Sequence, residues 1–206
     1  MPPRKKPHSP HDSSDRDQLR ELLYRQSFRY SDQPAFKLTS GQMSRYYVDC
    51  KKVTLDPKGA ALIGRIVFNR IKALRPQGIG GLTLGADPIA MAVAVTSYLE
   101  GQPIPAYIIR KEPKGHGSRA WIEGNLPEGA AVVVVEDVVT TGGSTIKAIE
   151  RLKAHGCKIL RVIALVDRQE GGREAIEASG YPLESLFTVD DFLSLAGVTR
   201  PSSDPS

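Results

Sequence analysis

One stretch constrains the fold of this chain more than any other: residues 130–145, which read AAVVVVEDVVTTGGST. Four consecutive valines are β-branched and apolar on both faces of a pleat, so residues 132–135 predict a strand buried inside a parallel sheet. Two adjacent carboxylates, Glu136 and Asp137, follow at once. Open α/β sheets form their ligand crevice where such strands leave the sheet. We therefore expect an α/β domain with its site at this strand end.

The residues after the acidic pair form a loop of hydroxyls and glycines that opens into a helical pattern. Ile146, Ile149 and Leu152 fall on one helix face, and Gly156 closes the helix. Glycines let the backbone approach a ligand, and the N–H groups at a helix start attract anions, so the loop predicts phosphate binding. The acidic pair would accept hydrogen bonds from sugar hydroxyls. The alternative is a solvated strand end followed by an ordinary glycine turn.

This assembly resembles the phosphoribosyl pyrophosphate (PRPP) motif of the type I phosphoribosyltransferases. The resemblance implies that PRPP is bound by Glu136, Asp137, Val138, Val139, Thr140, Thr141, Gly142, Gly143 and Ser144. It also implies Mg²⁺ as cofactor, held mainly by PRPP and water near the acidic pair, with no certain metal site on the protein. A Walker A loop is disfavoured because Gly143, not lysine, precedes Ser144. The glycines between residues 78 and 85 do not complete a dinucleotide fingerprint either.

A second informative stretch is residues 110–117, which read RKEPKGHG and place four potential cations among glycine and proline. A solvated basic loop is the ordinary interpretation of such a run. Its position after a strand and before the PRPP motif favours a catalytic role instead, because cations in a closed loop stabilise the negative charge of a departing pyrophosphate. A histidine beside a lysine there is able to donate a proton or hydrogen bond to that group.

Residues 110–117 match the flexible catalytic loop of orotate phosphoribosyltransferases. The match implies a homodimer in which this loop serves the neighbouring subunit's site. The resemblance assigns PRPP-binding roles to Arg110, Lys111, Lys114 and His116. It assigns catalytic roles to Lys114, His116 and Asp137.

Two strands predict the binding site for the base. Alternation over residues 36–50 predicts a hairpin with a turn at Ser40 and Gly41, in which Tyr46 and Tyr47 either pack as cross-strand aromatics or cover a pyrimidine. The string resembles the amino-terminal signature of orotate phosphoribosyltransferases, which implies an orotate contact for Tyr47.

Residues 159–166 predict a core strand that ends in Asp167 and Arg168, level with the acidic pair. The Arg168 guanidinium would pair with a planar carboxylate such as that of orotate, or form a salt bridge with Asp167 or Glu170. The family pattern DRxEG implies that Arg168 and Thr140 orient orotate.

The other elements fill out a single domain at residues 16–197, with disordered tails at 1–15 and 198–206. Asp56 with Pro57, and Asp87 with Pro88, predict helix starts. The second of these helices, over residues 89–99, is apolar nearly all round and should lie in the core or in a subunit interface. We further expect helices near 16–28, 57–74, 174–179 and 190–195, and strands near 78–84, 104–109 and 183–187.

Composition excludes several classes of protein. The chain has 206 residues, 40% of them hydrophobic, which suits one α/β domain. Its net charge of +5 discriminates little, and a nucleic-acid role for the basic residues at 4–6 is a minor alternative. Cys50 and Cys157 have no metal-ligand spacing, so we expect a reduced, cytoplasmic setting. No secretory or membrane segment is visible, so no membrane partner is expected. No nucleic-acid partner is expected either.

The resemblance as a whole implies a type I phosphoribosyltransferase fold, with a central, mostly parallel sheet flanked by helices and a small hood from the N-terminal and C-terminal segments. It implies conversion of orotate and PRPP to orotidine 5′-monophosphate and pyrophosphate in de novo pyrimidine (UMP) biosynthesis. Thr39 and residues 85–87 stand where many relatives carry lysine. The alternatives are a phosphoribosyltransferase for another base and a PRPP-sensing regulator that binds RNA or DNA.

Overall fold

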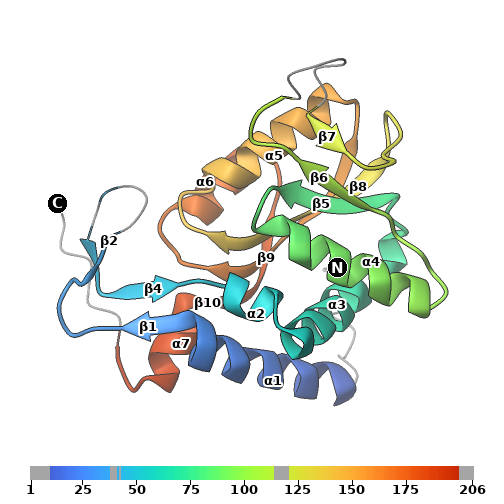
Figure 1. Cartoon of the computed structure of the whole chain (residues 1–206). Coiled ribbons are helices and arrows are strands. Elements are labelled where there is room, and N and C mark those ends of the chain that lie inside the picture. Colours follow the sequence, from blue (N-terminus) through green and yellow to red (C-terminus); the bar gives the residue numbers. More distant parts are fainter. Residues whose placement is uncertain (1–9, 38–40, 42, 114–120, 200–206) are drawn as a thin grey trace, which may run out of the picture.

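The computed structural model describes residues 10–37, 41, 43–113 and 121–199. Within them a six-stranded sheet with the order β10-β9-β8-β5-β6-β7 forms the centre of the molecule (Figure 1). Its strands are β5 (Gly78–Leu82), β6 (Ala106–Ile109), β7 (Ile122–Glu123), β8 (Ala131–Val139), β9 (Lys158–Asp167) and β10 (Leu183–Thr188). All neighbouring strands are parallel except β6 and β7. The predicted α/β fold with a mostly parallel sheet is confirmed.

The valines of β8 face both sides of this sheet and are buried on each. Val133 and Val135 belong to the core that includes α3 (Pro57–Ile71) and α4 (Ala86–Leu99). Val132 and Val134 belong to the core that includes α5 (Gly143–Ala154) and α6 (Gly172–Ala178). Helices therefore cover both faces of β8, as its unbroken apolar run predicts.

The N-terminal segment and the last helix form the hood. It consists of α1 (Pro10–Ser27), β1 (Phe28–Tyr30), β2 (Phe36–Lys37), β3 (Met43–Ser44), β4 (Tyr46–Val48), α2 (Lys51–Thr54) and α7 (Val189–Leu195). Strand β1 pairs with β4, and β2 pairs with β3 in the predicted hairpin, where Gly41 has φ 90°. The rings of Phe28 and Phe192 lie 5.6 Å apart and join the two ends of the chain.

The first helix begins earlier in the chain than the sequence predicts, and packing against the core continues slightly beyond residue 197. Helix α1 begins at Pro10 rather than near residue 16, because proline suits a first helical turn and the Asp15 carboxylate lies 2.8 Å from Nε of Arg65 on α3. At the other end, Val198 still packs against the core. Residues 1–9 and 200–206 lie outside the described residues.

The two Asp-Pro pairs behave differently. Asp56 caps α3 as predicted, since its carboxylate accepts the backbone N–H groups of Lys58 and Gly59, and a short 3₁₀ turn, η1 (Lys72–Leu74), follows α3. The prediction that Asp87 caps the next helix is wrong. Helix α4 begins earlier, after Gly85, because the Asp87 carboxylate instead accepts the Thr83 hydroxyl at 2.6 Å.

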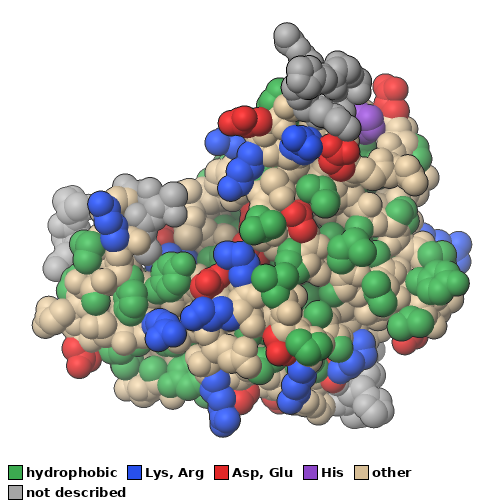
Figure 2. Space-filling view, in the orientation of Figure 1, with side chains coloured by type: hydrophobic (Ala, Val, Ile, Leu, Met, Phe, Trp, Pro, Cys, Tyr) green, Lys and Arg blue, Asp and Glu red, His purple; other side chains and the backbone are tan. Residues whose placement is uncertain are grey.

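The apolar helix α4 lies half in the core. Ile89, Ala90 and Val93 are buried, whereas Met91, Val95 and Leu99 are 53%, 55% and 77% exposed. Figure 2 shows hydrophobic side chains on the surface over α4. Within the described parts of the chain, no helix combines the length and apolarity needed to cross a bilayer.

Candidate functional site

The acidic pair lies inside β8 rather than beyond its end, which corrects the expectation from sequence. Strand β8 continues to Val139 because its pairing with β9 continues to Asp167. Glu136 and Asp137 are consequently buried, at 5% and 8% exposure. Successive strand residues face opposite sides of a sheet, so Glu136 points toward α5, where it accepts the Thr145 hydroxyl at 3.3 Å, and Asp137 points toward the hood.

Burial changes the chemistry of Glu136. Burial first, and the neighbouring Asp137 charge second, raise the pKa of Glu136 to about 8. Its carboxyl group is therefore protonated in a large fraction of molecules at neutral pH, and it can donate as well as accept a hydrogen bond. A buried pair of this kind is able to bind adjacent hydroxyl groups of a sugar.

Asp137 contacts two elements that sequence reasoning did not connect with it. One Asp137 oxygen lies 3.5 Å from Nζ of Lys51, at the start of α2, and the other accepts the backbone N–H of Val138 at 2.9 Å. A Cβ on Gly85 would lie 2.3 Å from Oδ1 of Asp137. Only glycine therefore allows the loop after β5 to come this close to the carboxylate.

The loop after β8 has the geometry of an anion site. Gly142 adopts φ 78° and precedes α5, a helix of 12 residues whose N-terminus has no side-chain cap. Its first N–H groups are thus available to a phosphate, and Thr141, Gly143 and Ser144 are exposed there. A Cβ on Gly172 would lie 2.3 Å from the Thr140 carbonyl oxygen, so this loop packs directly against the start of α6.

Arg168 lies next to this loop, beyond the acidic pair rather than level with it. The register pairs Glu136 with Ala164 and Val139 with Asp167, and the Arg168 N–H donates to the Val139 carbonyl. The expectation of equal level is therefore wrong, because Arg168 lies about three to four residues further along the sheet than the acidic pair. The Arg168 side chain is 4% exposed, and its guanidinium lies 2.7 Å from the Glu170 carboxylate. Of the two ion pairs considered from sequence, the pair with Glu170 forms.

Tyr46, rather than Tyr47, accompanies Arg168. The Arg168 guanidinium lies 5.0 Å from the centre of the Tyr46 ring, and the Tyr46 hydroxyl donates to Glu170 at 3.1 Å. Tyr47 points to the other side of β4, stacks on Phe36 with ring centres 6.1 Å apart and is 40% exposed. An orotate contact for Tyr47 stays a prediction, and Tyr46, which the sequence considered together with Tyr47, is the tyrosine that lies beside Arg168.

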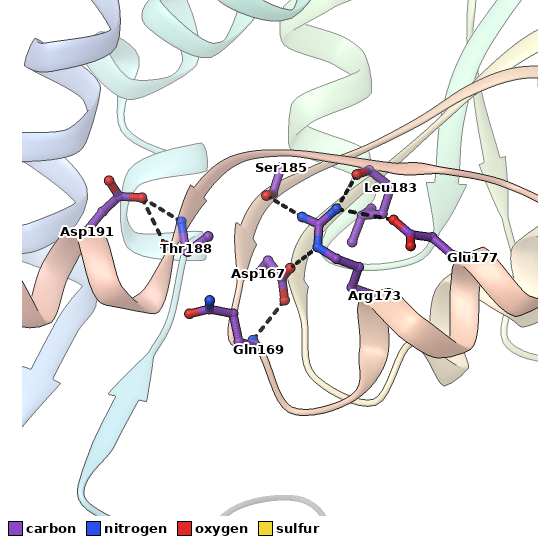
Figure 3. A network of polar contacts seen from close by, with 8 residues as sticks. All are labelled: Asp167, Gln169, Arg173, Glu177, Leu183, Ser185, Thr188 and Asp191. Carbon is purple, nitrogen blue, oxygen red and sulfur yellow. Dashed lines mark hydrogen bonds and ion pairs between the residues drawn. The ribbon is translucent and has the colours of Figure 1, made fainter. Parts of the chain in front are cut away.

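Figure 3 shows what holds the segment that carries Arg168. The fully buried Asp167 accepts hydrogen bonds from Nε of Arg173 at 3.0 Å and from the backbone N–H of Gln169 at 2.8 Å. Arg173 also donates to the Leu183 carbonyl and the Ser185 hydroxyl of β10. These bonds tie the turn after β9 to the neighbouring strand, so Arg168 extends from a fixed backbone.

A cleft of about 310 Å³ runs along the carboxyl ends of β8, β5 and β6. Figure 2 shows the surface hollowed between the hood and the rest of the molecule. The residues that line the cleft are Lys51, Leu82, Thr83, Leu84, Gly85, Lys111, Glu136, Asp137 and Ser144. The structure thus brings together the acidic pair, the start of α5 after the loop that follows β8, and part of the basic stretch.

The start of the basic stretch is held by Arg151 on α5. Arg151 donates to the carbonyl oxygens of Arg110 and Lys111, and its guanidinium stacks 3.9 Å from the centre of the Trp121 ring. Arg110 itself pairs with Glu123 at 3.0 Å, so the cation that lines the cleft here is Lys111. Lys114 and His116, which carry the catalytic predictions for this stretch, lie outside the described residues.

The site suits a metal that arrives with its ligand. Within the described ranges, no cluster of three His, Cys, Asp or Glu side chains is able to hold a metal ion by itself. Asp137 offers a carboxylate at the cleft beside the Glu136 carboxyl group, and one such carboxylate matches Mg²⁺ that is bound mainly by phosphates and water. The residues present therefore fit the expected cofactor.

Comparison with known proteins agrees with this geometry. The model of the phosphoribosyl transferase domain family matches residues 79–192. The orotate phosphoribosyltransferase of Aquifex aeolicus (strain VF5) is 49% identical over 179 residues, which are 87% of this chain and 98% of that protein. That of Nostoc sp. (strain PCC 7120 / SAG 25.82 / UTEX 2576) is 53% identical over 177 residues, covering 85% of this chain and 84% of that one.

Solved structures are similar over the same region. The Mycobacterium tuberculosis H37Rv orotate phosphoribosyltransferase in complex with Fe(III) dicitrate superimposes with a TM-score of 0.76 at 39% identity, covering 86% of this chain and 98% of that one. The same enzyme in complex with PRPP gives a TM-score of 0.71 at 36% identity, with the same coverage.

Proposed function

Because the chain belongs to the orotate phosphoribosyltransferases within the phosphoribosyl transferase family, we propose that it converts orotate and PRPP to orotidine 5′-monophosphate and pyrophosphate, a step of de novo pyrimidine biosynthesis. One observation carries the assignment to this site: the buried acidic pair and the uncapped start of α5 meet at one cleft, with Arg168 beside the phosphate loop. The solved complex of a relative with PRPP supports the choice of donor.

The reaction proposed is a displacement at the anomeric carbon of PRPP. A ring nitrogen of orotate gives up its N–H proton to water and forms the new bond to that carbon, while the bond to pyrophosphate breaks through an oxocarbenium-like state. Glu136 and Asp137 hold the ribose hydroxyls, residues 139–144 hold the 5′-phosphate, and Arg168 with Thr140 orients the orotate carboxylate and ring. These contacts supply positioning and electrostatic stabilisation, and no side chain becomes a covalent nucleophile.

Negative charge grows on the leaving pyrophosphate as its bond to the ribose breaks. Mg²⁺, when bound with PRPP, neutralises part of that charge. Lys111 lines the same chain's cleft, and Lys114 and His116 complete the basic stretch in sequence. Lys114 stabilises the departing oxygen electrostatically, and His116 donates a proton or hydrogen bond to it. A cytoplasmic location belongs to the same proposal, and it is supported by two buried cysteines that are both free.

A direct assay tests this function. Purified full-length protein is mixed with Mg²⁺ and PRPP, and with orotate, adenine, hypoxanthine or uracil in separate reactions. We expect loss of orotate absorbance with release of pyrophosphate, and no pyrophosphate release above background with the other bases. Turnover of another base in preference to orotate would replace this proposal with a different phosphoribosyltransferase.

We also propose a homodimer that buries the exposed face of α4. This face, with Leu55 from the hood, lines an apolar groove of about 600 Å³, and Leu55 and Leu99 are 69% and 77% exposed. Contiguous apolar side chains that are exposed in this way commonly mark a protein–protein contact. A second copy is the occupant that fits, because the basic stretch 110–117 is proposed to complete the neighbouring subunit's site.

Introducing a charge into this face should separate the subunits. We expect Val95→Glu to elute as a monomer in size-exclusion chromatography with light scattering, and to lose most of its turnover because each site lacks its neighbour's loop. Leu195→Glu on α7, another exposed apolar position, serves as control and should remain dimeric. A Val95→Glu protein with the wild-type mass would show that α4 does not form the interface.

The contact between Arg151 and the basic stretch leads to a further prediction. Arg151→Ala removes two hydrogen bonds to the carbonyls at residues 110 and 111 and the stacking on Trp121. We expect kcat to fall by about tenfold, because a misplaced loop aligns its charges poorly, while the KM for orotate stays near wild type. Lys153→Ala, an exposed change on the same helix, should leave kcat unchanged. Equal kcat values for both variants would exclude a positioning role for Arg151.

A further inference from the structure

A lysine of the hood reaches the cleft. Lys51 is the first residue of α2, and its Nζ lies 3.1 Å from an Asp49 oxygen and 3.5 Å from an Asp137 oxygen. Its side chain is 42% exposed and lines the cleft. An ammonium group carries three N–H donors, so one remains for a ligand after these two carboxylates.

The order of the strands places Lys51 beside the loop at residues 83–85. In the sheet β5 lies between β8 and β6, so the loop at residues 83–85 lies between Asp137 on β8 and Lys111 after β6. Lys51 lies over Asp137 on one side of this loop. A group bound over residues 83–85 would therefore lie within reach of Lys51 on the Asp137 side of the cleft.

The loop itself supplies no positive charge to this part of the cleft. Residues 83–85 are threonine, leucine and glycine, and a Cβ at Gly85 would lie 2.3 Å from Oδ1 of Asp137. A side chain at residue 85 would thus displace the carboxylate. Any anion bound here also approaches Asp137, and a cation between them is needed to offset the repulsion.

We propose that Lys51 binds the diphosphate group of PRPP from the hood side of the cleft. The inference rests on the proposed function and adds a binding residue contributed by the hood. Partial burial lowers the pKa of Lys51, but the Asp137 charge and the hydrogen bond to Asp49 outweigh it, so the pKa lies above its usual value and the ammonium stays charged. Asp49 and Asp137 also hold the side chain in place before the ligand arrives.

Two ligands distinguish this role from a structural one. PRPP carries the diphosphate, whereas orotidine 5′-monophosphate has the ribose and 5′-phosphate without it. We expect Lys51→Ala to raise the Kd for PRPP with Mg²⁺ by about tenfold or more in calorimetry, as loss of a charged hydrogen bond does, and to change the Kd for orotidine 5′-monophosphate by less than about twofold. Lys52→Ala, an exposed change at the adjacent residue, should leave both values unchanged.

The outcomes separate the possible roles. If Lys51→Ala raises the Kd for both ligands equally, Lys51 acts only through Asp137. If the Kd for PRPP does not change, Lys51 does not contact the diphosphate. Either result overturns the inference. Lys51→Gln, which keeps the length and polarity without the charge, decides the matter if the alanine variant does not fold. Wild-type protein that binds neither ligand would instead refute the proposed function.

Discussion

Arg168→Ala is expected to raise the KM for orotate by about a hundredfold, with little change in the Kd for PRPP. The Arg168 side chain is 4% exposed, and its guanidinium contacts both the Tyr46 ring and the Glu170 carboxylate. A charged, bidentate contact in such a dry site contributes far more than one in water. Steady-state kinetics with either substrate varied, together with calorimetry on PRPP, would measure both effects.

A matched control comes from the same strand. Arg161 also lies on β9 and pairs with a carboxylate, that of Glu184 at 2.9 Å, but it is far from the phosphate loop. Arg161→Ala should therefore leave the KM for orotate near wild type. If Arg168→Ala folds normally and its KM for orotate stays within about twofold of wild type, the pyrimidine does not bind at Arg168.

Asp137→Asn is expected to reduce turnover by at least a hundredfold, and its effect on the stability of the folded protein should become more favourable as the pH rises. The amide keeps the shape of the side chain and can still accept the Val138 N–H. It loses the negative charge that the proposed mechanism uses near the ribose and the bound metal. The variant also loses the contact with Lys51, which stays charged between pH 5 and pH 9 and therefore changes stability by a similar amount throughout that range.

The sign of this pH dependence follows from Glu136. Its folded pKa, about 8, lies above the ordinary value, so the folded state binds a proton more tightly than the unfolded state. Glu136 therefore costs stability increasingly as pH rises from about 4.5 to about 8, and the cost is constant above that range. Asp137→Asn removes a charge that raises this pKa, which lowers the cost by about 1.4 kcal/mol for each unit by which the pKa falls.

Thermal unfolding at several pH values measures this effect. The melting temperature of Asp137→Asn relative to wild type should rise as the pH increases from 5 to 9. A difference that is the same at pH 5 and pH 9 would mean that the Glu136 and Asp137 carboxyl groups do not interact in the folded protein.

The sequence predicted those helices and strands that depend on interactions between residues close together in the chain. The run of valines requires a strand buried on both faces, and β8 has that burial. Asp56 and Pro57 start a helix because both act within one turn. Asp87 and Pro88 have the same local pattern, but the Thr83 hydroxyl competes for the carboxylate, and this competition depends on the loop after β5.

The sequence did not predict contacts between distant segments. Lys51 and Asp137 are 86 residues apart, and nothing nearby distinguishes Lys51 from the exposed Lys52. Arg151 looks like an ordinary basic residue in the last turn of a helix, yet it holds the carbonyls of residues 110 and 111. Likewise, the choice between Tyr46 and Tyr47 depends on which face of β4 meets Arg168. Such partners follow from the packing of the hood on the sheet rather than from any local pattern.

The most direct test is a crystal structure of the protein with orotidine 5′-monophosphate bound. We expect the 5′-phosphate at the start of α5, the ribose hydroxyls on Glu136 and Asp137, and the pyrimidine carboxylate on the Arg168 guanidinium. A nucleotide bound elsewhere, or one whose pyrimidine carboxylate has no contact with Arg168, would contradict the assignment of this cleft.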